Sequence, residues 1–185
     1  MTADRRRSPL ADWAERFAAV EVHSGGKLRL AEVPFVPQVN VRATPEGRSA
    51  AGDAFGVALP THPNTVTRAG DTVALWLGPD EWLVLNQPCR SDGEGWSAVD
   101  VGALRTTVAV GGSAILDLLA HGCALDVAAL TGAWCAQTLL ARARVILLCE
   151  APDDVRILVV ASFANYVADW LLDAANEWTT GTTRS

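Results

Sequence analysis

The sequence predicts an α+β fold in which two small β-α-β-β halves place antiparallel sheets against helices. Stretches with a period of two occur in both halves of the chain, as expected for half-buried strands. These stretches follow one another in runs instead of alternating singly with helices, which favours an α+β arrangement. The chain has 185 residues, half of them hydrophobic, enough for one domain or two small ones that share a core.

A helix is expected to open the ordered part of the chain. Ser8 can cap free amides and Pro9 is favoured at a first helical position. The apolar residues that follow recur at helical spacing, and they are Leu10, Trp13, Ala14, Phe17 and Ala18. Gly25 and Gly26 end this region.

A half-buried strand is predicted next. Gln38, Asn40 and Arg42 alternate with two valines, which is the pattern of a strand with one polar face. Pro34 and Pro37 precede it and cannot donate ladder hydrogen bonds, so we expect the strand to begin at a sheet edge. A short helix is then expected over residues 50–58.

The clearest local signal is a β-hairpin over residues 72–86. TVALWL and EWLVLN read as strands, and Gly78, Pro79 and Asp80 between them favour a chain reversal. Residues 87–96 read as an exposed loop. This loop is the expected boundary between an N-terminal half, 8–96, and a C-terminal half, 97–178, with flexible tails at 1–7 and 179–185.

The second half repeats strand and helix signals. Residues 105–110 read as a strand, 113–120 as a helix capped by Ser113, and 138–141, 145–149 and 155–160 as strands. Ser162 is expected to cap a final helix. Its core-facing stripe is predicted to be Phe163, Val167, Trp170, Leu171, Ala174 and Trp178.

Composition excludes several functions. The net charge of −6 lacks the electrostatic footprint of a non-specific nucleic-acid binder. No stretch approaches the roughly 18 apolar residues of a membrane span, and the residues after Arg5-Arg6-Arg7 carry too many charges for a leader peptide. The four cysteines form no Cys-x-x-Cys pair and fit reduced thiols. A cytoplasmic protein is therefore expected.

Standard catalytic and cofactor motifs are missing from the sequence. There is no glycine-rich dinucleotide loop, phosphate-binding loop, nucleophile elbow or zinc-protease motif. His121 and Cys123, with Asp126 nearby, are the one candidate for nucleophilic catalysis, against a simpler interpretation as a helix-end histidine beside a buried thiol. We therefore predict no catalytic, cofactor-binding or metal-binding residue on this chain.

Several strings in combination resemble a known family. They are LPTHPNTVTRAGDTVALWLGPDEWLVLN, VDVGALRTTVAVGGSAILDLLAHGCALDV, CAQTLLARARVILL and SFANYVADWLLDAA. Together they resemble the gamma subunit of heterotetrameric sarcosine oxidase, over about residues 28–175. One departure is the loop after Asp100-Val101, which reads Gly-Ala-Leu where family members often carry a polar Ser-His pair.

The resemblance implies membership of an oxidoreductase complex. Such a complex oxidises sarcosine with oxygen to glycine and hydrogen peroxide, and releases formaldehyde or methylenetetrahydrofolate. The family implies that FAD, FMN, NAD and tetrahydrofolate are held by other subunits and that no cofactor is held by gamma. The implied partners are the alpha, beta and delta subunits, and the implied fold is that of the folate-binding aminomethyltransferases.

We expect a non-catalytic assembly subunit, and two alternatives stay open. They are a stand-alone folate-binding protein, which needs a pocket carboxylate for the pterin ring, and an aminomethyltransferase, for which the chain is short. Arg105 is expected to form an ion pair at the surface or at an interface. The candidate partner interface comprises Gln38, Asn40, Arg42 and Arg105.

Overall fold

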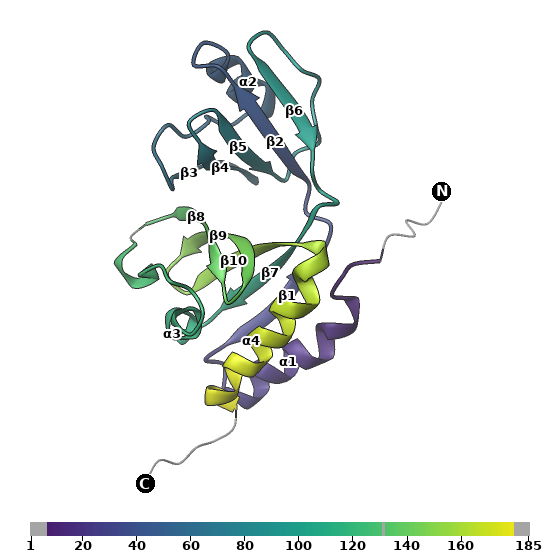
Figure 1. Cartoon of the computed structure of the whole chain (residues 1–185), viewed down its shortest axis with the longest axis vertical. Coiled ribbons are helices and arrows are strands. Elements are labelled where there is room, and N and C mark those ends of the chain that lie inside the picture. Colours follow the sequence, from purple (N-terminus) through teal and green to yellow (C-terminus); the bar gives the residue numbers. More distant parts are fainter. Residues whose placement is uncertain (1–6, 131, 180–185) are drawn as a thin grey trace.

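The chain forms two antiparallel five-stranded sheets in a computed structural model that describes residues 7–130 and 132–179. Most of the two expected tails, 1–7 and 179–185, lies outside the described residues. The first sheet has the order β1-β7-β10-β9-β8 and the second β3-β4-β5-β2-β6. Figure 1 shows one sheet above the other, so the expected α+β class with helix-backed antiparallel sheets is confirmed.

The first sheet contains the longer strands. Its members are β1 (Arg29–Val33), β7 (Arg105–Gly111), β8 (Trp134–Leu140), β9 (Ala143–Ala151) and β10 (Asp154–Val160). Helices α1 (Ala14–His23), α3 (Ile115–Ala120) and α4 (Ala164–Thr179) belong to the same part of the molecule. The short 3-10 helices are Ala11–Trp13, Val127–Ala129 and Ala161–Phe163.

The second sheet carries the predicted hairpin. Its members are β2 (Gln38–Ala43), β3 (Val66–Ala69), β4 (Thr72–Gly78), β5 (Glu81–Leu85) and β6 (Trp96–Asp100), with α2 (Arg48–Phe55) packed on it. The register Trp76↔Trp82 and Gly78↔Glu81 confirms the hairpin over residues 72–86. Strands β3 and β6 were not predicted from the sequence. Both are short and largely exposed, so their apolar residues do not alternate clearly with polar ones.

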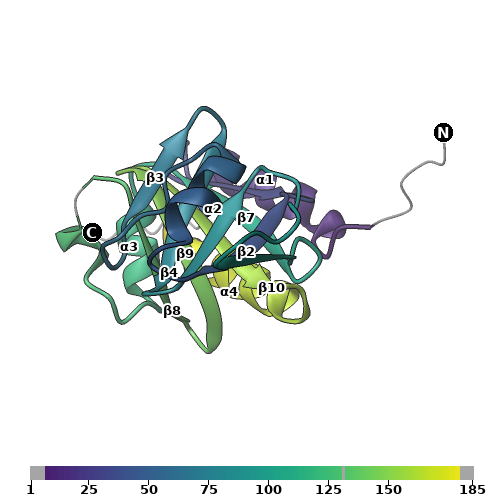
Figure 2. The same ribbon diagram turned by 90° about the horizontal axis from the view of Figure 1, so that it is seen from above.

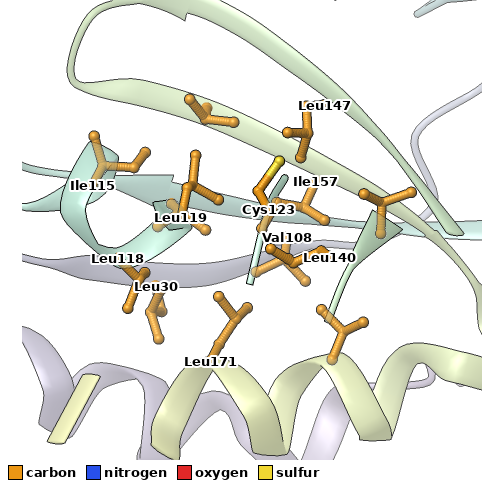
Figure 3. Packing of buried hydrophobic residues seen from close by; sticks show 14 of the residues in the cluster. Leu30, Val108, Ile115, Leu118, Leu119, Cys123, Leu140, Leu147, Ile157 and Leu171 are labelled. Carbon is orange, nitrogen blue, oxygen red and sulfur yellow. The ribbon is translucent and has the colours of Figure 1, made fainter. Parts of the chain in front are cut away.

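Three clusters of buried apolar side chains lie between the layers of the fold. The largest lies between the first sheet and its helices, where Figure 3 shows Leu30, Val108, Leu140 and Leu171 converging. A second cluster joins Leu75, Leu83 and Leu85 of one sheet to Ile146, Leu148 and Leu158 of the other. A third lies between the second sheet and α2. The order of layers is therefore helices, sheet, sheet, helix (Figure 1). In the view from above, α2 lies in front of the second sheet (Figure 2).

The division into sheets differs from the division expected at residue 96. Strand β1 pairs with β7 of the first sheet, with Leu30 opposite Val110, although β1 lies in the N-terminal half. Strand β6 pairs with β2 of the second sheet, with Val41 opposite Ala98. The chain thus starts in one sheet, crosses to the other and returns. Strand pairing is set by burial of apolar faces, not by order along the chain.

Strand β2 is an interior strand, and the expectation of an edge strand is wrong. It pairs with β5 through Val39↔Val84 and with β6 through Val41↔Ala98. Pro34 and Pro37 remain compatible with this position because both precede the first ladder pair, Gln38↔Leu85. The free edges of this sheet are β3 and β6.

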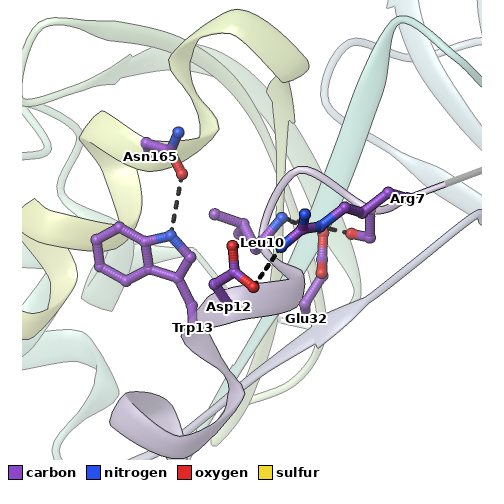
Figure 4. Close-up of polar contacts among 7 residues, drawn as sticks. Arg7, Leu10, Asp12, Trp13, Glu32 and Asn165 are labelled. Atoms are coloured by element: carbon purple, nitrogen blue, oxygen red, sulfur yellow. Dashed lines mark hydrogen bonds and ion pairs between the residues drawn. The ribbon is translucent and has the colours of Figure 1, made fainter.

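The first residues of the described chain are fixed against both β1 and α4. Figure 4 shows Trp13 Nε1 donating to Asn165 Oδ1 at 3.0 Å, and Leu10 N donating to Glu32 Oε1 at 3.3 Å. The α-helix begins at Ala14, later than Ser8 and Pro9 suggested, after a 3-10 turn. Leu10 was expected to begin the apolar face of the helix. It lies before the helix instead, and its side chain is fully buried.

Helix α4 buries a face that is rotated from the predicted stripe. Its buried residues are Ala164, Val167, Ala168, Leu171 and Ala175. Val167 and Leu171 were expected there, whereas Phe163 precedes the helix and is 45% exposed. The small alanines let the helix approach α1 and the sheet closely. The predicted caps are wrong as well, because neither Ser113 nor Ser162 occupies the capping position of its helix.

Candidate functional site

The two segments that cross between the sheets lie side by side. Residues 34–37 lead from β1 to β2, and residues 101–104 lead from β6 back to β7. Val101 N donates to Gln38 O at 2.9 Å, and Gln38 Nε2 donates to Arg105 O at 3.2 Å. These bonds tie the two crossings into one junction (Figure 1).

The junction opens into a groove of about 1030 Å³, which we call the crossover groove. Its lining includes Phe35, Gln38, Asp100, Leu104, Arg105 and Ala161. Phe35 has a φ of +57°, in a region that bulky residues rarely adopt, and its side chain is 44% exposed. Leu104 is 48% exposed on the opposite crossing. Exposed apolar side chains therefore stand at the rim of this groove.

Arg105 is the charged group at the centre of this region. Burial lowers the pKa of its guanidinium, and the negative charge of Glu81 partly opposes that effect. Among the described residues no carboxylate lies within ion-pairing distance of Arg105, so the ion pair expected from the sequence is not found there. A half-buried cation without an acidic partner carries a desolvation cost.

Gln38 positions Arg105. Its side chain is buried, and its amide nitrogen holds the Arg105 carbonyl. The other amide atom, Oε1, is buried and accepts no hydrogen bond from the described residues. An unpaired buried acceptor costs about 1–3 kcal/mol, and such groups are uncommon outside strained or functional regions.

Asn40 and Arg42 are already paired within the second sheet. Asn40 Nδ2 donates to Glu81 Oε1 at 2.7 Å, while Arg42 contacts Asp80 at 3.0 Å and Glu81 at 2.8 Å. The structure therefore brings Gln38 and Arg105 into direct contact and leaves Asn40 and Arg42 in a separate surface network. That Gln38, Asn40, Arg42 and Arg105 together form an interface with a partner remains a proposal.

A second, smaller groove starts from Arg105 and runs between β8, β9 and β10. It has a volume of about 560 Å³ and includes Arg144, Gln137 and Leu139. Leu139 is 50% exposed, and Arg144 forms no ion pair with the described residues. Gln137 Nε2 donates to Leu77 O at 2.8 Å, which ties this groove to the second sheet. The sequence did not identify Arg144, Leu104 and Leu139 as candidate site residues, because exposure of a side chain beside a groove produces no local sequence pattern.

Several carboxylates of the two sheets already accept hydrogen bonds or form ion pairs. Glu32 accepts from Thr106 Oγ1 at 2.6 Å, and Asp100 accepts from Gly102 N at 2.8 Å. Glu150 pairs with Arg68 and, at 3.0 Å, with Arg156. A pterin ring needs a carboxylate within a pocket. Of these three groups only Asp100 lines the crossover groove, and it is exposed to solvent.

The candidate nucleophile is not assembled. His121 Nδ1 lies 2.8 Å from Asp117 O and its Nε2 lies 3.1 Å from Glu177, while Cys123 is buried, with its Sγ 4.0 Å from Thr138 Oγ1. Asp126 caps a 3-10 helix instead of orienting the imidazole. Within the described residues, no group of three or more His, Cys, Asp or Glu is placed to hold a metal ion.

The comparisons with known proteins agree over nearly the whole chain. The model of the family described as "Sarcosine oxidase, gamma subunit family" matches residues 41–177. A sarcosine oxidase subunit gamma of Corynebacterium sp. strain U-96 is 34% identical over 195 residues, with 94% of this chain and 91% of the relative covered. That of strain P-1 is 31% identical, with 94% and 91% covered.

The chain belongs to the sarcosine oxidase gamma subunit family.

Two solved structures are similar in fold to this chain. A chain of the heterotetrameric sarcosine oxidase from Corynebacterium sp. U-96, in complex with pyrrole 2-carboxylate, matches with a TM-score of 0.86 and 32% identity. The match covers 94% of this chain and 96% of that one. The glycine cleavage system aminomethyltransferase T from Bartonella henselae matches with a TM-score of 0.63 and 13% identity, over 89% of this chain and 56% of that one. The second likeness confirms the expected fold.

Cysteine labelling should separate the thiols of this gamma-family chain by burial. Cys89 is exposed, whereas Cys135 is fully buried, and burial raises the pKa of its thiol to about 11. At pH 8 a thiol with that pKa is only about one part in a thousand thiolate, the reactive form. We expect a thiol reagent to modify Cys89 within minutes and to spare Cys135 and Cys123. Rapid native labelling of Cys135, followed by peptide mass spectrometry, would contradict this.

Proposed function

We propose that the chain is the gamma subunit of a heterotetrameric, flavin-dependent sarcosine oxidase and serves assembly, not catalysis. The complex would convert sarcosine to glycine and hydrogen peroxide, with formaldehyde or methylenetetrahydrofolate as the one-carbon product. The alpha, beta and delta subunits would be its partners, and they would hold the FAD, FMN, NAD and tetrahydrofolate. A cytoplasmic location fits the four free cysteines.

The observation that most supports this proposal is the end-to-end match to a chain of a solved heterotetrameric sarcosine oxidase. That match covers 94% of this chain and 96% of the other, at 32% identity. The occupied carboxylates and the unassembled His121–Cys123 pair support an assembly role over catalysis. None of the helices in the described part of the chain is long and apolar enough to span a membrane.

Co-expression is the direct test of this assignment. The chain should co-purify with a tagged alpha subunit as a complex of four different subunits, and the complex should produce hydrogen peroxide from sarcosine. Omission of the chain should lower the yield of the complete complex. Recovery of a fully active complex without it would contradict the assembly role.

The isolated chain is expected to bind no flavin. The turn from β7 to α3 carries Gly111 and Gly112 but not the G-x-G-x-x-G pattern that holds a dinucleotide pyrophosphate, and the backbone of Lys27 packs directly against Gly112. The purified chain should therefore be colourless and should leave the fluorescence of added FAD or FMN unchanged at micromolar concentrations. A yellow protein with stoichiometric flavin would contradict this, and the intact complex provides the positive control.

The alternative of a stand-alone folate-binding protein has a separate test. Tetrahydrofolate titrated into the isolated chain should give no saturable heat change, because Asp100, the one carboxylate of the described residues that lines the crossover groove, is exposed to solvent and accepts from Gly102 N. Saturable binding by the isolated chain would favour that alternative.

A further inference from the structure

We propose that Arg105 is the receptor for an acidic side chain of a neighbouring subunit, which enters between the two sheets at the meeting point of the crossover groove and the smaller groove. This inference rests on the assembly role proposed above and names the chemistry of the contact. The observations that carry it are the geometry of the two grooves, the charges that line them and the exposed apolar side chains around them.

Charge complementarity identifies the occupant. Arg105 lines both grooves, and Arg144 lines the second, and neither has an ion-pair partner among the described residues. The other charged groups of the crossover groove are Arg7, which pairs with Asp12, and the exposed Asp100, which accepts from Gly102 N. The nearby carboxylate of Glu81 is held by Asn40 and Arg42 at 2.7 and 2.8 Å, so it is committed elsewhere. A carboxylate supplied from outside would satisfy the guanidinium through two parallel hydrogen bonds, the geometry that arginine favours.

The apolar rim indicates a protein and not a small metabolite. Leu104 is 48% exposed beside Arg105, and Leu139 is 50% exposed in the second groove. Ala161 lines the crossover groove and its N donates to Leu104 O, which places the start of α4 next to this rim. There Phe163 and Tyr166 pack edge to face and are 45% and 40% exposed. Protein interfaces combine such apolar cores with an arginine anchor.

The junction also prepares Arg105 for binding. Gln38 fixes the Arg105 carbonyl, and the bond from Val101 N to Gln38 O fixes the second crossing. Fixing the backbone before binding reduces the entropy lost when the contact forms. Gln38 is therefore a positioning residue and Arg105 the contact residue.

The test compares Arg105→Gln with the matched variant Arg16→Gln in the co-expressed complex. Arg16 lies on α1, where it pairs with Asp169 and covers the ring of Trp13, away from both grooves. We expect Arg105→Gln to weaken the association of gamma with the rest of the complex at least tenfold, and Arg16→Gln to change it less than twofold. Arg105→Lys should give an intermediate loss, because lysine keeps the charge but loses the planar fork.

Two readouts separate docking from folding. The isolated Arg105→Gln chain should melt at or slightly above the temperature of the unsubstituted chain, because a partly desolvated unpaired charge is removed. The salt dependence of association should also become flatter in this variant, since an ion pair is lost. A lower melting temperature that accounts for the weaker association would overturn the proposal in favour of a structural role.

Other occupants give different results. If Asp4 of the chain's own first residues were the acidic partner, Asp4→Asn and Arg105→Gln would lower the melting temperature of the isolated chain by the same amount, which would overturn the proposal. Saturable binding of free glutarate to the isolated chain, lost in Arg105→Gln, would indicate a metabolite site and would overturn it too. Unchanged association of Arg105→Gln refutes this inference alone, whereas failure of the unsubstituted chain to join the complex refutes the proposed function.

Discussion

Replacement of Trp82 by alanine is expected to destabilise the chain by about 3–5 kcal/mol, the usual cost of truncating a buried tryptophan. Trp82 on β5 is 1% exposed and packs in the cluster between the second sheet and α2. Its indole Nε1 donates to Pro60 O at 2.7 Å. The substitution removes the largest fully buried side chain of the described residues and leaves a buried carbonyl unpaired.

A loss of this size equals much of the stability of an ordinary domain, which is about 5–15 kcal/mol. Urea unfolding of the isolated chain, followed by circular dichroism, measures the change. Trp82→Phe is the matched control, because it keeps most of the ring volume and removes the hydrogen bond to Pro60. We expect it to cost about 1–3 kcal/mol. Equal losses in the two variants would show that the cavity contributes little.

The second large effect is expected at Leu171 in α4. Its side chain is fully buried among the helices and the first sheet, so Leu171→Ala should cost about 2–5 kcal/mol. Phe163 was predicted to lie on the same stripe but is 45% exposed. Phe163→Ala should therefore change the free energy of unfolding by about 0.5 kcal/mol or less. Thermal and urea unfolding of the two isolated variants test the contrast.

The same pair of variants separates the core from the docking face. Leu171→Ala should reduce the amount of folded chain and should reduce assembly only in proportion to that loss. Phe163→Ala should fold normally, and we expect it to weaken assembly because Phe163 and Tyr166 lie beside the rim of the crossover groove. A Phe163→Ala chain that is as unstable as Leu171→Ala would place this aromatic in the core after all.

Short-range patterns were reliable where the signal was local. The hairpin of residues 72–86, the strand at 105–110 and the helix from 164 onward follow from turn residues and from spacing along a few turns. The family strings were equally local, since each is a continuous segment. Cap positions were less predictable, because 3-10 turns precede both α1 and α4 and displace the helix start by several residues.

The candidate site was only half predictable. Arg105 and Gln38 were singled out as polar residues on strands, and the structure puts the amide of Gln38 on the carbonyl of Arg105. Asn40 and Arg42, chosen by the same alternation, are paired with Asp80 and Glu81 instead. The alternation of a strand identifies which residues share a face, but it does not say what lies opposite that face.

The sequence by itself determined the α+β class, the hairpin and the gamma-subunit family. Only the tertiary structure decided that β1 pairs with β7 and that β6 pairs with β2, across the boundary expected at residue 96. It also decided that β2 is an interior strand and that two crossings meet at Arg105. Strand pairing joins residues far apart in the chain, and the free energy that selects a partner comes from burying whole faces together. No local pattern contains that information.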